Sequence, residues 1–181
     1  MYAVAGVKST REDGIAEERR ECDRQGNVTK VSNFGLDGKP KADKDGVFER
    51  RYEYDEDGNR RKDSLIYAVA GVKGTREDGI AEVRFEYDAR GNVTKVLYFG
   101  SNGKPKADKD GVFEMRSEYD EDGNRRKDSL IYAVADAKAV REDGIAEVRF
   151  EYDERGKVKN VLRFDVNGKQ IAPDGEGVQN D

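Results

Sequence analysis

The sequence repeats one unit, and its clearest copy is the stretch of residues 79–100, GIAEVRFEYDARGNVTKVLYFG. Apolar and charged residues alternate in its first half, so the apolar residues from Ala81 to Tyr87 fall on one side of an extended strand. The segment from Asp88 to Asn92 has the composition of a turn, and residues 93–99 have that of a second strand. The unit therefore predicts a β-hairpin.

Glycines mark the connections of this hairpin. Gly91 is expected to adopt a positive φ, because it has no Cβ to clash with the backbone. Further along, the pair Asn102-Gly103 predicts a tight type I′ turn. An Asp-Gly pair precedes the first strand of every unit, at residues 13–14, 45–46, 78–79, 110–111 and 143–144.

Two periods run through the chain. Tyr-Ala-Val-Ala begins at Tyr2, Tyr67 and Tyr132, which are 65 residues apart, and a Tyr-Asp or Cys-Asp pair recurs every 32 or 33 residues. The chain is therefore predicted to be mainly β, an elongated antiparallel array of five hairpin units over residues 1–172 with about two strands per unit. Residues 173–181 lose the pattern and are expected to form a polar, mobile tail.

The first unit differs from the others. Its strand presents Glu18, Arg20 and Cys22 where the third unit presents Val83, Phe85 and Tyr87. Polar end units terminate the core of a stacked repeat, so we expect this strand to be a cap that is exposed to solvent or internally paired. Capped ends in turn predict a monomer.

Composition excludes several classes of function. The chain is 40% charged with a net charge of −5, and the two signs are interspersed, so we expect no nucleic-acid partner. No stretch has the apolar length of a membrane span, which predicts no membrane insertion. The single cysteine allows no internal disulfide, and the chain has no histidine, the commonest general base. We therefore predict no enzyme, no catalytic or metal-binding residues and no cofactor.

Acid-rich turns raise calcium binding as an alternative. Asp55, Asp57 and Asn59 place side-chain oxygens at alternate positions, but the glycine comes fourth and basic residues follow at once. Calcium needs six to eight oxygen ligands, and EF-hand loops place glycine sixth. Capping of the turns by their own side chains is favoured here. The same pattern occurs at residues 43–46, 108–111 and 120–124.

The aromatic residues have two interpretations. Their alternation with charged residues favours a place in the core, and Phe85 in particular is expected to be buried. The alternative is an exposed platform on which sugars stack. The residues concerned are Tyr52, Tyr54, Phe85, Tyr87, Phe99, Phe150, Tyr152 and Phe164.

The motif Tyr-Asp-x-x-Gly-Asn is the most specific signal. It is complete at residues 54–59, 87–92 and 119–124 and degenerate at residues 22–27 and 152–157. In this motif the chain resembles the YD-repeat (Rhs-type) family of bacterial surface and toxin proteins, although its units are longer and fewer. The resemblance implies a spiralling antiparallel sheet that serves as scaffolding, with no catalytic residue, in a bacterial surface or secreted setting.

The expected function is a non-catalytic structural or adhesive β-repeat module of a bacterial surface or secreted protein. It would bind an unknown protein or glycan through the broad face of its sheet. The alternative is a carbohydrate- or calcium-binding module, with an enzyme third. Met1-Tyr2-Ala3 has no basic segment followed by an apolar run, so a secretion signal is not expected within this sequence.

Overall fold

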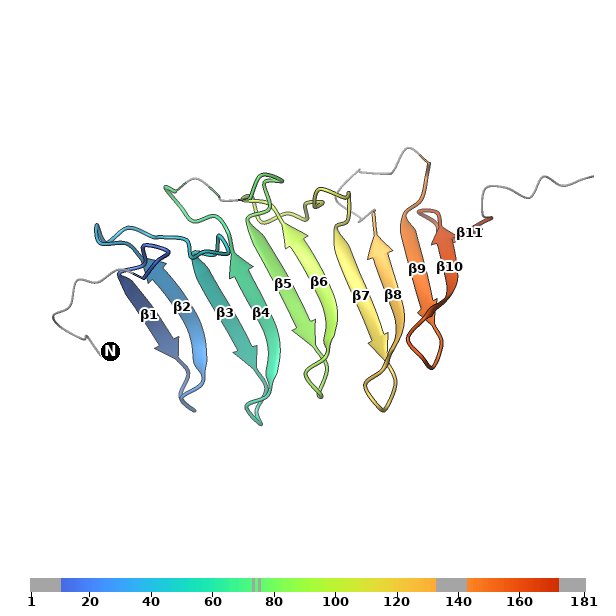
Figure 1. The fold of residues 1–181 in the computed structure, drawn as a ribbon, viewed down its shortest axis with the longest axis horizontal. Coiled ribbons are helices and arrows are strands. Elements are labelled where there is room, and N and C mark those ends of the chain that lie inside the picture. The colour runs from blue at the N-terminus through green and yellow to red at the C-terminus, as the bar shows by residue number, and fades with distance from the viewer. Residues whose placement is uncertain (1–10, 73, 75, 133–142, 173–181) are drawn as a thin grey trace, which may run out of the picture.

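A computed structural model describes residues 11–72, 74, 76–132 and 143–172. They form one open antiparallel sheet of 11 strands, in which each strand pairs with the next along the chain (Figure 1). This confirms the predicted hairpin array. No helix in the described part of the chain is long and apolar enough to cross a membrane. The strands are β1 (Glu17–Cys22), β2 (Val28–Phe34), β3 (Glu49–Tyr54), β4 (Arg60–Ile66), β5 (Glu82–Tyr87), β6 (Val93–Phe99), β7 (Glu114–Tyr119), β8 (Arg125–Ile131), β9 (Glu147–Tyr152), β10 (Val158–Phe164) and β11 (Gln170–Ile171).

The first ten strands form the predicted hairpins, from β1–β2 to β9–β10. Short turns close the hairpins along one edge of the row, which is the lower edge in Figure 1. Longer connections between hairpins gather along the upper edge. The short strand β11 pairs with β10 at Arg163 and Phe164. The predicted tail, residues 173–181, lies outside the described residues.

Two kinds of junction join the hairpins, and they explain the longer period. At β2–β3 and β6–β7 only a short stretch of the two strands pairs, with Lys30 opposite Arg51 in the first case. At β4–β5 and β8–β9 the paired stretch is longer, and Lys62 lies opposite Glu86. Because the two junctions alternate, the structure repeats fully only after two hairpins, which is the 65-residue repeat of the sequence.

The hairpin turns share one geometry. The Asp88 carbonyl accepts a hydrogen bond from the Gly91 amide (3.2 Å), the Asp88 amide donates to Asn92 (3.0 Å), and Gly91 has a φ of 85°. This is a type I turn followed by a glycine bulge, and it confirms the prediction for Gly91. The type I′ prediction for Asn102-Gly103 is wrong. Type I′ needs two positive φ values, and no described residue other than glycine has one.

We expect Gly91→Val to destabilise the protein by about 1–3 kcal/mol. A Cβ added at Gly91 would meet no atom within 4 Å, so the cost comes from the positive φ alone. Gly91→Asn is the matched control and should cost less, because asparagine tolerates this conformation better than valine does. Urea unfolding of the three proteins measures the difference. Equal costs for valine and asparagine would contradict a backbone origin.

The core lies at the upper ends of the strands and not along their middles. An apolar pair follows the Asp-Gly of each connection and leads directly into the next odd-numbered strand. Its first member is deeply buried, with Val47 and Ile80 each only 1% exposed. Its second member continues the ladder, as when the Ala81 amide donates to the Phe99 carbonyl (2.8 Å). The buried apolar residues are Ile15, Val47, Phe48, Ile66, Ile80, Ala81, Val83, Phe99, Val112, Phe113, Ile131, Tyr132, Ile145 and Ala146.

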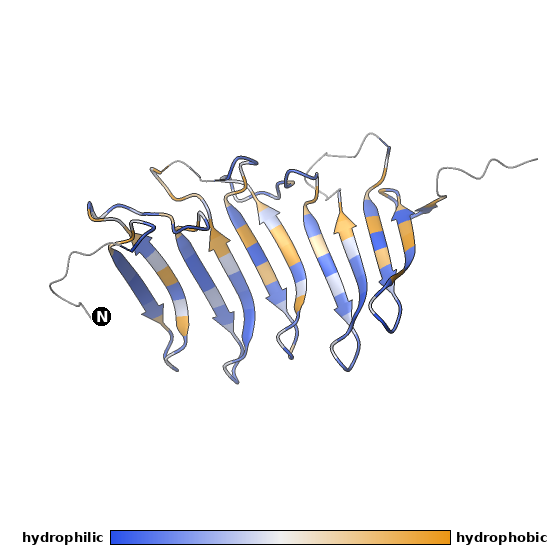
Figure 2. Ribbon diagram, viewed as in Figure 1, coloured by the Kyte–Doolittle hydropathy of each residue, from blue (hydrophilic) through white to orange (hydrophobic). Residues whose placement is uncertain are grey.

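The prediction that Phe85 is buried is wrong. Phe85 is half-buried, whereas Val83, two residues nearer the upper edge on the same face, is buried. The described residues form a single-layered sheet, and its longer connections lie along the upper edge, away from Phe85 in the middle of β5 (Figure 1). Figure 2 shows the resulting distribution: β1 and β3 are almost entirely hydrophilic, while β5, β6 and β9 carry hydrophobic segments.

Candidate binding face

The two faces of the sheet have different chemistry. Pairing across the strands places Tyr52, Asp63, Phe85 and Val96 in one row, and we call this side the aromatic face. The opposite side, which we call the charged face, carries the pattern Glu-x-Arg-x-Glu on β1, β3, β5, β7 and β9. Its residues are Glu17, Arg19, Glu21, Glu49, Arg51, Glu53, Glu82, Arg84, Glu86, Glu114, Arg116, Glu118, Glu147, Arg149 and Glu151.

The charged face neutralises itself. Each arginine pairs with the glutamate two residues earlier, as Arg84 does with Glu82 at 2.8 Å. Lysines of the even-numbered strands pair with the second glutamate of the pattern, the one nearer the hairpin turn, as Lys95 does with Glu86 at 3.3 Å. Burial acts to raise the pKa of Glu82, but hydrogen bonds from Arg84 and Ser64 outweigh it and lower the pKa. Glu82 therefore remains ionised, and the charges of this face are internally paired.

Two of the eight predicted aromatic residues lie on the charged face. The guanidinium of Arg84 lies 4.0 Å from the ring centre of Phe99, and that of Arg149 lies 4.3 Å from that of Phe164. These cation–π contacts cover the rings. The other six residues, Tyr52, Tyr54, Phe85, Tyr87, Phe150 and Tyr152, lie on the aromatic face and are half-buried. A single platform of eight rings is therefore not formed.

The tyrosine hydroxyl of the Tyr-Asp motif links its hairpin to the preceding one through a hydrogen bond. The hydroxyls of Tyr54 and Tyr119 donate to the carbonyls of Val28 (2.9 Å) and Val93 (3.0 Å) in the preceding strand. At the other kind of junction, the Tyr87 hydroxyl donates to the Asp63 carboxylate (2.9 Å), and Tyr152 does the same to Asp128. The sequence contains a signal for this role, because the motif has cysteine in place of tyrosine only in β1, the first strand of the described sheet.

Asp63 is a buried carboxylate within the aromatic face. It is 8% exposed, its cross-strand neighbours are Tyr52 and Phe85, and one oxygen accepts from Tyr87 and pairs with Arg60 at 3.2 Å. Its other oxygen, Oδ1, has no hydrogen-bond partner. Burial raises the pKa of Asp63, against the opposing effects of the Tyr87 hydrogen bond and the Arg60 charge. Burial and the hydrogen bond to Asp63 also raise the pKa of Tyr87 to about 12, so the phenol stays protonated at neutral pH.

The unfolding free energy of the Asp63→Asn variant should increase relative to that of the wild type as the pH rises. A raised folded-state pKa gives stability that is fully present below the unfolded pKa and is lost as the pH rises through the folded value. Asparagine removes this titration. Urea unfolding of both proteins from about pH 3 to pH 7 measures the trend. A difference in unfolding free energy that stays constant across this range would contradict it.

Asp128 is the matched control for Asp63 in the next 65-residue repeat. There Ser117 replaces Tyr52 as the cross-strand neighbour, and its hydroxyl donates to Asp128 Oδ1 at 2.7 Å. Both carboxylate oxygens of Asp128 are therefore in use. Asp128→Asn should destabilise the protein at pH 7, because an amide offers only one of the two acceptors.

The acids of the turns act as caps. Oδ1 of Asp55 accepts hydrogen bonds from the amides of Asp57 (3.1 Å) and Asn59 (2.8 Å), and its other oxygen accepts from Arg61. The hydrogen bonds from Asn59 lower the pKa of Asp55, so the cap is ionised at neutral pH. In the part of the chain that the structure describes, no group of three or more acids and cysteines is arranged to hold a metal ion.

Calcium is therefore expected to leave the folded state unchanged. Ligands that bind only the native state raise the melting temperature through mass action, so a calcium site would raise it over that of a chelator control. We expect equal melting temperatures in millimolar calcium and in EDTA. Magnesium at the same concentration controls for ionic strength. A large rise with calcium alone would show that the turn carboxylates bind the metal in preference to the backbone amides.

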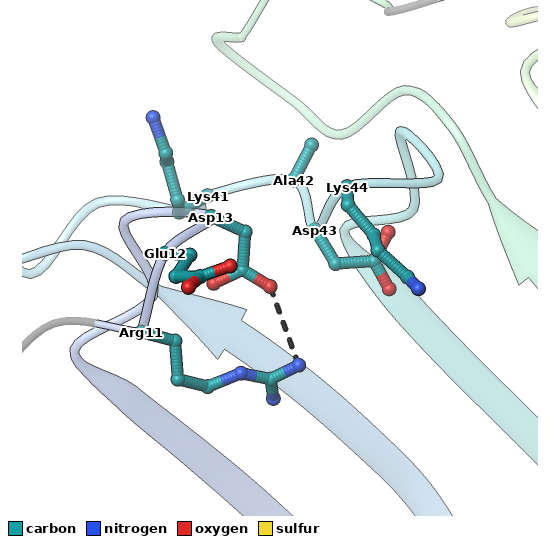
Figure 3. Close-up of a pocket in the computed structure, with 7 residues that line it drawn as sticks. All are labelled: Arg11, Glu12, Asp13, Lys41, Ala42, Asp43 and Lys44. Carbon is teal, nitrogen blue, oxygen red and sulfur yellow. Dashed lines mark ion pairs between the residues drawn. The ribbon is translucent and has the colours of Figure 1, made fainter.

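One hollow lies among the connections at the upper end of the sheet. It has a volume of about 700 Å³ and lies between the turn that contains Asp13 and the segment from Lys41 to Lys44 (Figure 3). Two of its three acids are engaged in ion pairs: Asp13 pairs with Arg11 at 3.3 Å, and Asp43 pairs with Arg50 at 2.6 Å while capping its own turn. The hollow is therefore lined by acidic and basic side chains together, and Asp13 and Asp43 are already paired with arginines.

The first strand matches its expected environment. All six residues of β1 are exposed, and Arg20 pairs with Glu18 at 2.6 Å. Cys22 is also exposed and is a free thiol. The geometry expected of a cap is therefore present, and its effect on association remains a prediction.

The sequence matches no known protein family and no curated protein.

Proposed function

We propose that this chain is a non-catalytic structural or adhesive β-repeat module of a bacterial surface or secreted protein, and that it binds a protein or glycan through its aromatic face. The resemblance of the Tyr-Asp-x-x-Gly-Asn units to YD repeats supports the bacterial setting. On intact cells of the source organism, antibodies against the chain should label the outside. Labelling only after permeabilisation would contradict a surface location.

The observation that carries this proposal is the contrast between the two faces. The aromatic face exposes parts of its rings and aliphatic side chains, and in the described residues no second layer covers it. The charged face pairs each arginine with a glutamate of its own strand. Partly exposed rings on an uncovered sheet face can contact a partner, whereas charges that are paired within their own strand offer a partner few contacts.

A carbohydrate ligand is the second candidate, because of the spacing of two rings. Phe85 and Phe150 occupy equivalent positions in β5 and β9, four strands apart. With strands about 4.8 Å apart, the rings lie roughly 19 Å from each other along the sheet. Rings repeated along a flat face suit a ligand that is itself a repeating chain, and sugar rings stack on aromatic side chains through their C–H faces.

Glycan arrays and bead adhesion test the face directly. Phe85→Ala and Phe150→Ala should weaken binding of the chain to glycans, or of chain-coated beads to cells. Leu36→Ala is the control, because it removes an exposed apolar side chain from a connection and not from the aromatic face. Binding that survives both phenylalanine variants, with their folding checked by circular dichroism, would place the contact elsewhere.

A further inference from the structure

The outer edge of β10 is open along most of its length. Within the described residues, only β11 pairs with it, at Arg163 and Phe164. The stretch of β10 from Val158 to Leu162, which we call the open edge, has no described strand on its outer side. Val158 and Val161 are 53% and 43% exposed, which makes this edge both apolar and unpaired. Such an edge is a template for pairing with another strand.

Strands β2 and β6 are equivalent to β10 in the repeat, and in both of them the corresponding edge is covered. Pro40 and Pro105 bridge to the ends of β2 and β6, just as Gln170 of β11 pairs with the end of β10. Strands β3 and β7 then pair with the lower parts of β2 and β6. The covered valines, Val31 and Val96, are half-buried. β11 therefore occupies the place of the proline segment and leaves the place of the next strand empty.

A tyrosine hydroxyl completes both covered junctions. Tyr54 of β3 donates to the Val28 carbonyl, and Tyr119 of β7 donates to the Val93 carbonyl. The equivalent carbonyl on β10 belongs to Val158, and no described tyrosine donates to it. β6 and β10 also have the same residues at 93 and 158, 96 and 161, 97 and 162, and 99 and 164, whereas Lys95 and Tyr98 of β6 correspond to Asn160 and Arg163 of β10.

We propose that the open edge of β10 docks an antiparallel strand from another polypeptide, and that this strand carries the pattern Glu-x-Arg-x-Glu-Tyr of β3 and β7. Its tyrosine hydroxyl donates to the Val158 carbonyl, and its backbone pairs with the outward groups of β10. This is strand addition to a sheet edge, with the specificity set by the internal repeats.

Two other occupants fit less well. Residues 165–181 of this chain contain neither arginine nor tyrosine, so they cannot supply the pattern. A second copy offers β1, the other edge strand of the described sheet, but β1 ends in Cys22 and lacks the hydroxyl. In the register of β6–β7, it would also set Glu18 against Val161, where Met115 lies against Val96. The partner is therefore a different chain whose edge strand ends in tyrosine.

The test uses a peptide of residues 111–120, GVFEMRSEYD, which contains β7. Titrated into the isotope-labelled full chain, it should shift the amide signals of Val158 to Leu162 and leave those of β1 unchanged. A peptide with Tyr119→Phe should bind roughly 2- to 12-fold more weakly, which corresponds to one hydrogen bond. Shifts confined to β1, no shifts up to about 1 mM peptide, or equal affinity of the two peptides would overturn the proposal.

Two variants of the full chain locate the contact. The Val161 amide points outward, because Phe164 bonds to the hairpin partner and Arg163 bonds to β11. Val161→Pro removes this donor and should abolish peptide binding. Val166→Pro is the matched control, because Val166 is also an exposed valine but lies at the second position of a turn, where proline is favoured. Binding unaffected by Val161→Pro, or wild-type self-association that this variant abolishes, would refute the assigned site or occupant.

Discussion

Ile80→Ala should destabilise the array by about 2–5 kcal/mol, more than Phe85→Ala, although phenylalanine is the larger side chain. Ile80 is 1% exposed and lies in the connection that leads into β5. Its truncation removes apolar contacts and leaves a cavity that the surrounding backbone cannot easily fill. Phe85 lies on the open face and is only half-buried, so its truncation should cost roughly 1–2 kcal/mol.

Urea unfolding followed by circular dichroism measures both variants, since the chain has no tryptophan for fluorescence. Ile80→Val is the matched control and should lie between the wild type and Ile80→Ala. Ile145→Ala repeats the test in the equivalent connection before β9, where the isoleucine is also buried. A cost for Phe85→Ala that equals or exceeds that for Ile80→Ala would mean that the middle of the sheet is covered.

The hairpins and their turns could be predicted because they rest on local chemistry. Alternation of apolar and charged residues identifies a strand wherever one side differs from the other. The aspartate and glycine of each turn act within five residues, as in the cap that Asp88 makes on the amides of Arg90 and Asn92. The number of repeated units then predicts the number of strands. None of these inferences requires knowledge of what lies above the sheet.

The position of the core could not be predicted from alternation. Phe85 and Val83 belong to the same apolar side, yet only Val83 is buried, because burial depends on which connection folds over which end of the strand. The sequence does contain a signal for the buried positions, since an apolar pair follows the Asp-Gly of every unit. Ile80 and Ala81 form one such pair. A pair this short has no periodicity, so alternation alone does not place it in the core.

The role of the motif tyrosine depends on two hairpins at once. A single hairpin contains the tyrosine but not its acceptor, which lies in the preceding strand, 26 residues earlier for Tyr54 and 24 for Tyr87. The acceptor also changes between a carbonyl and a carboxylate as the junctions alternate. Pattern analysis of one unit therefore finds the residue but not its function. The exchange of tyrosine for Cys22 becomes informative only when the order of the strands is known.

The charged first strand bears on association of the array. β1 is exposed at every residue, and its charged pair, Glu18 and Arg20, takes the place of the valine and phenylalanine of β5. Burying these charges against another molecule would cost free energy of desolvation, whereas valine and phenylalanine would each gain roughly 1.5–3 kcal/mol on full burial. The strand therefore opposes the end-to-end pairing that the open edge of β10 would otherwise permit.

Glu18→Val combined with Arg20→Phe and Cys22→Tyr should promote end-to-end association of the chain. The three changes remove the charged pair, restore the apolar side found in β5, and place a tyrosine hydroxyl at the end of the strand. Sedimentation velocity at several concentrations should show the triple variant growing in size with concentration while the parent stays monomeric. Glu17→Val with Arg19→Phe is the matched control, because it changes the charged face of the same strand. If that control associates as strongly, general hydrophobicity and not restoration of the repeat drives assembly.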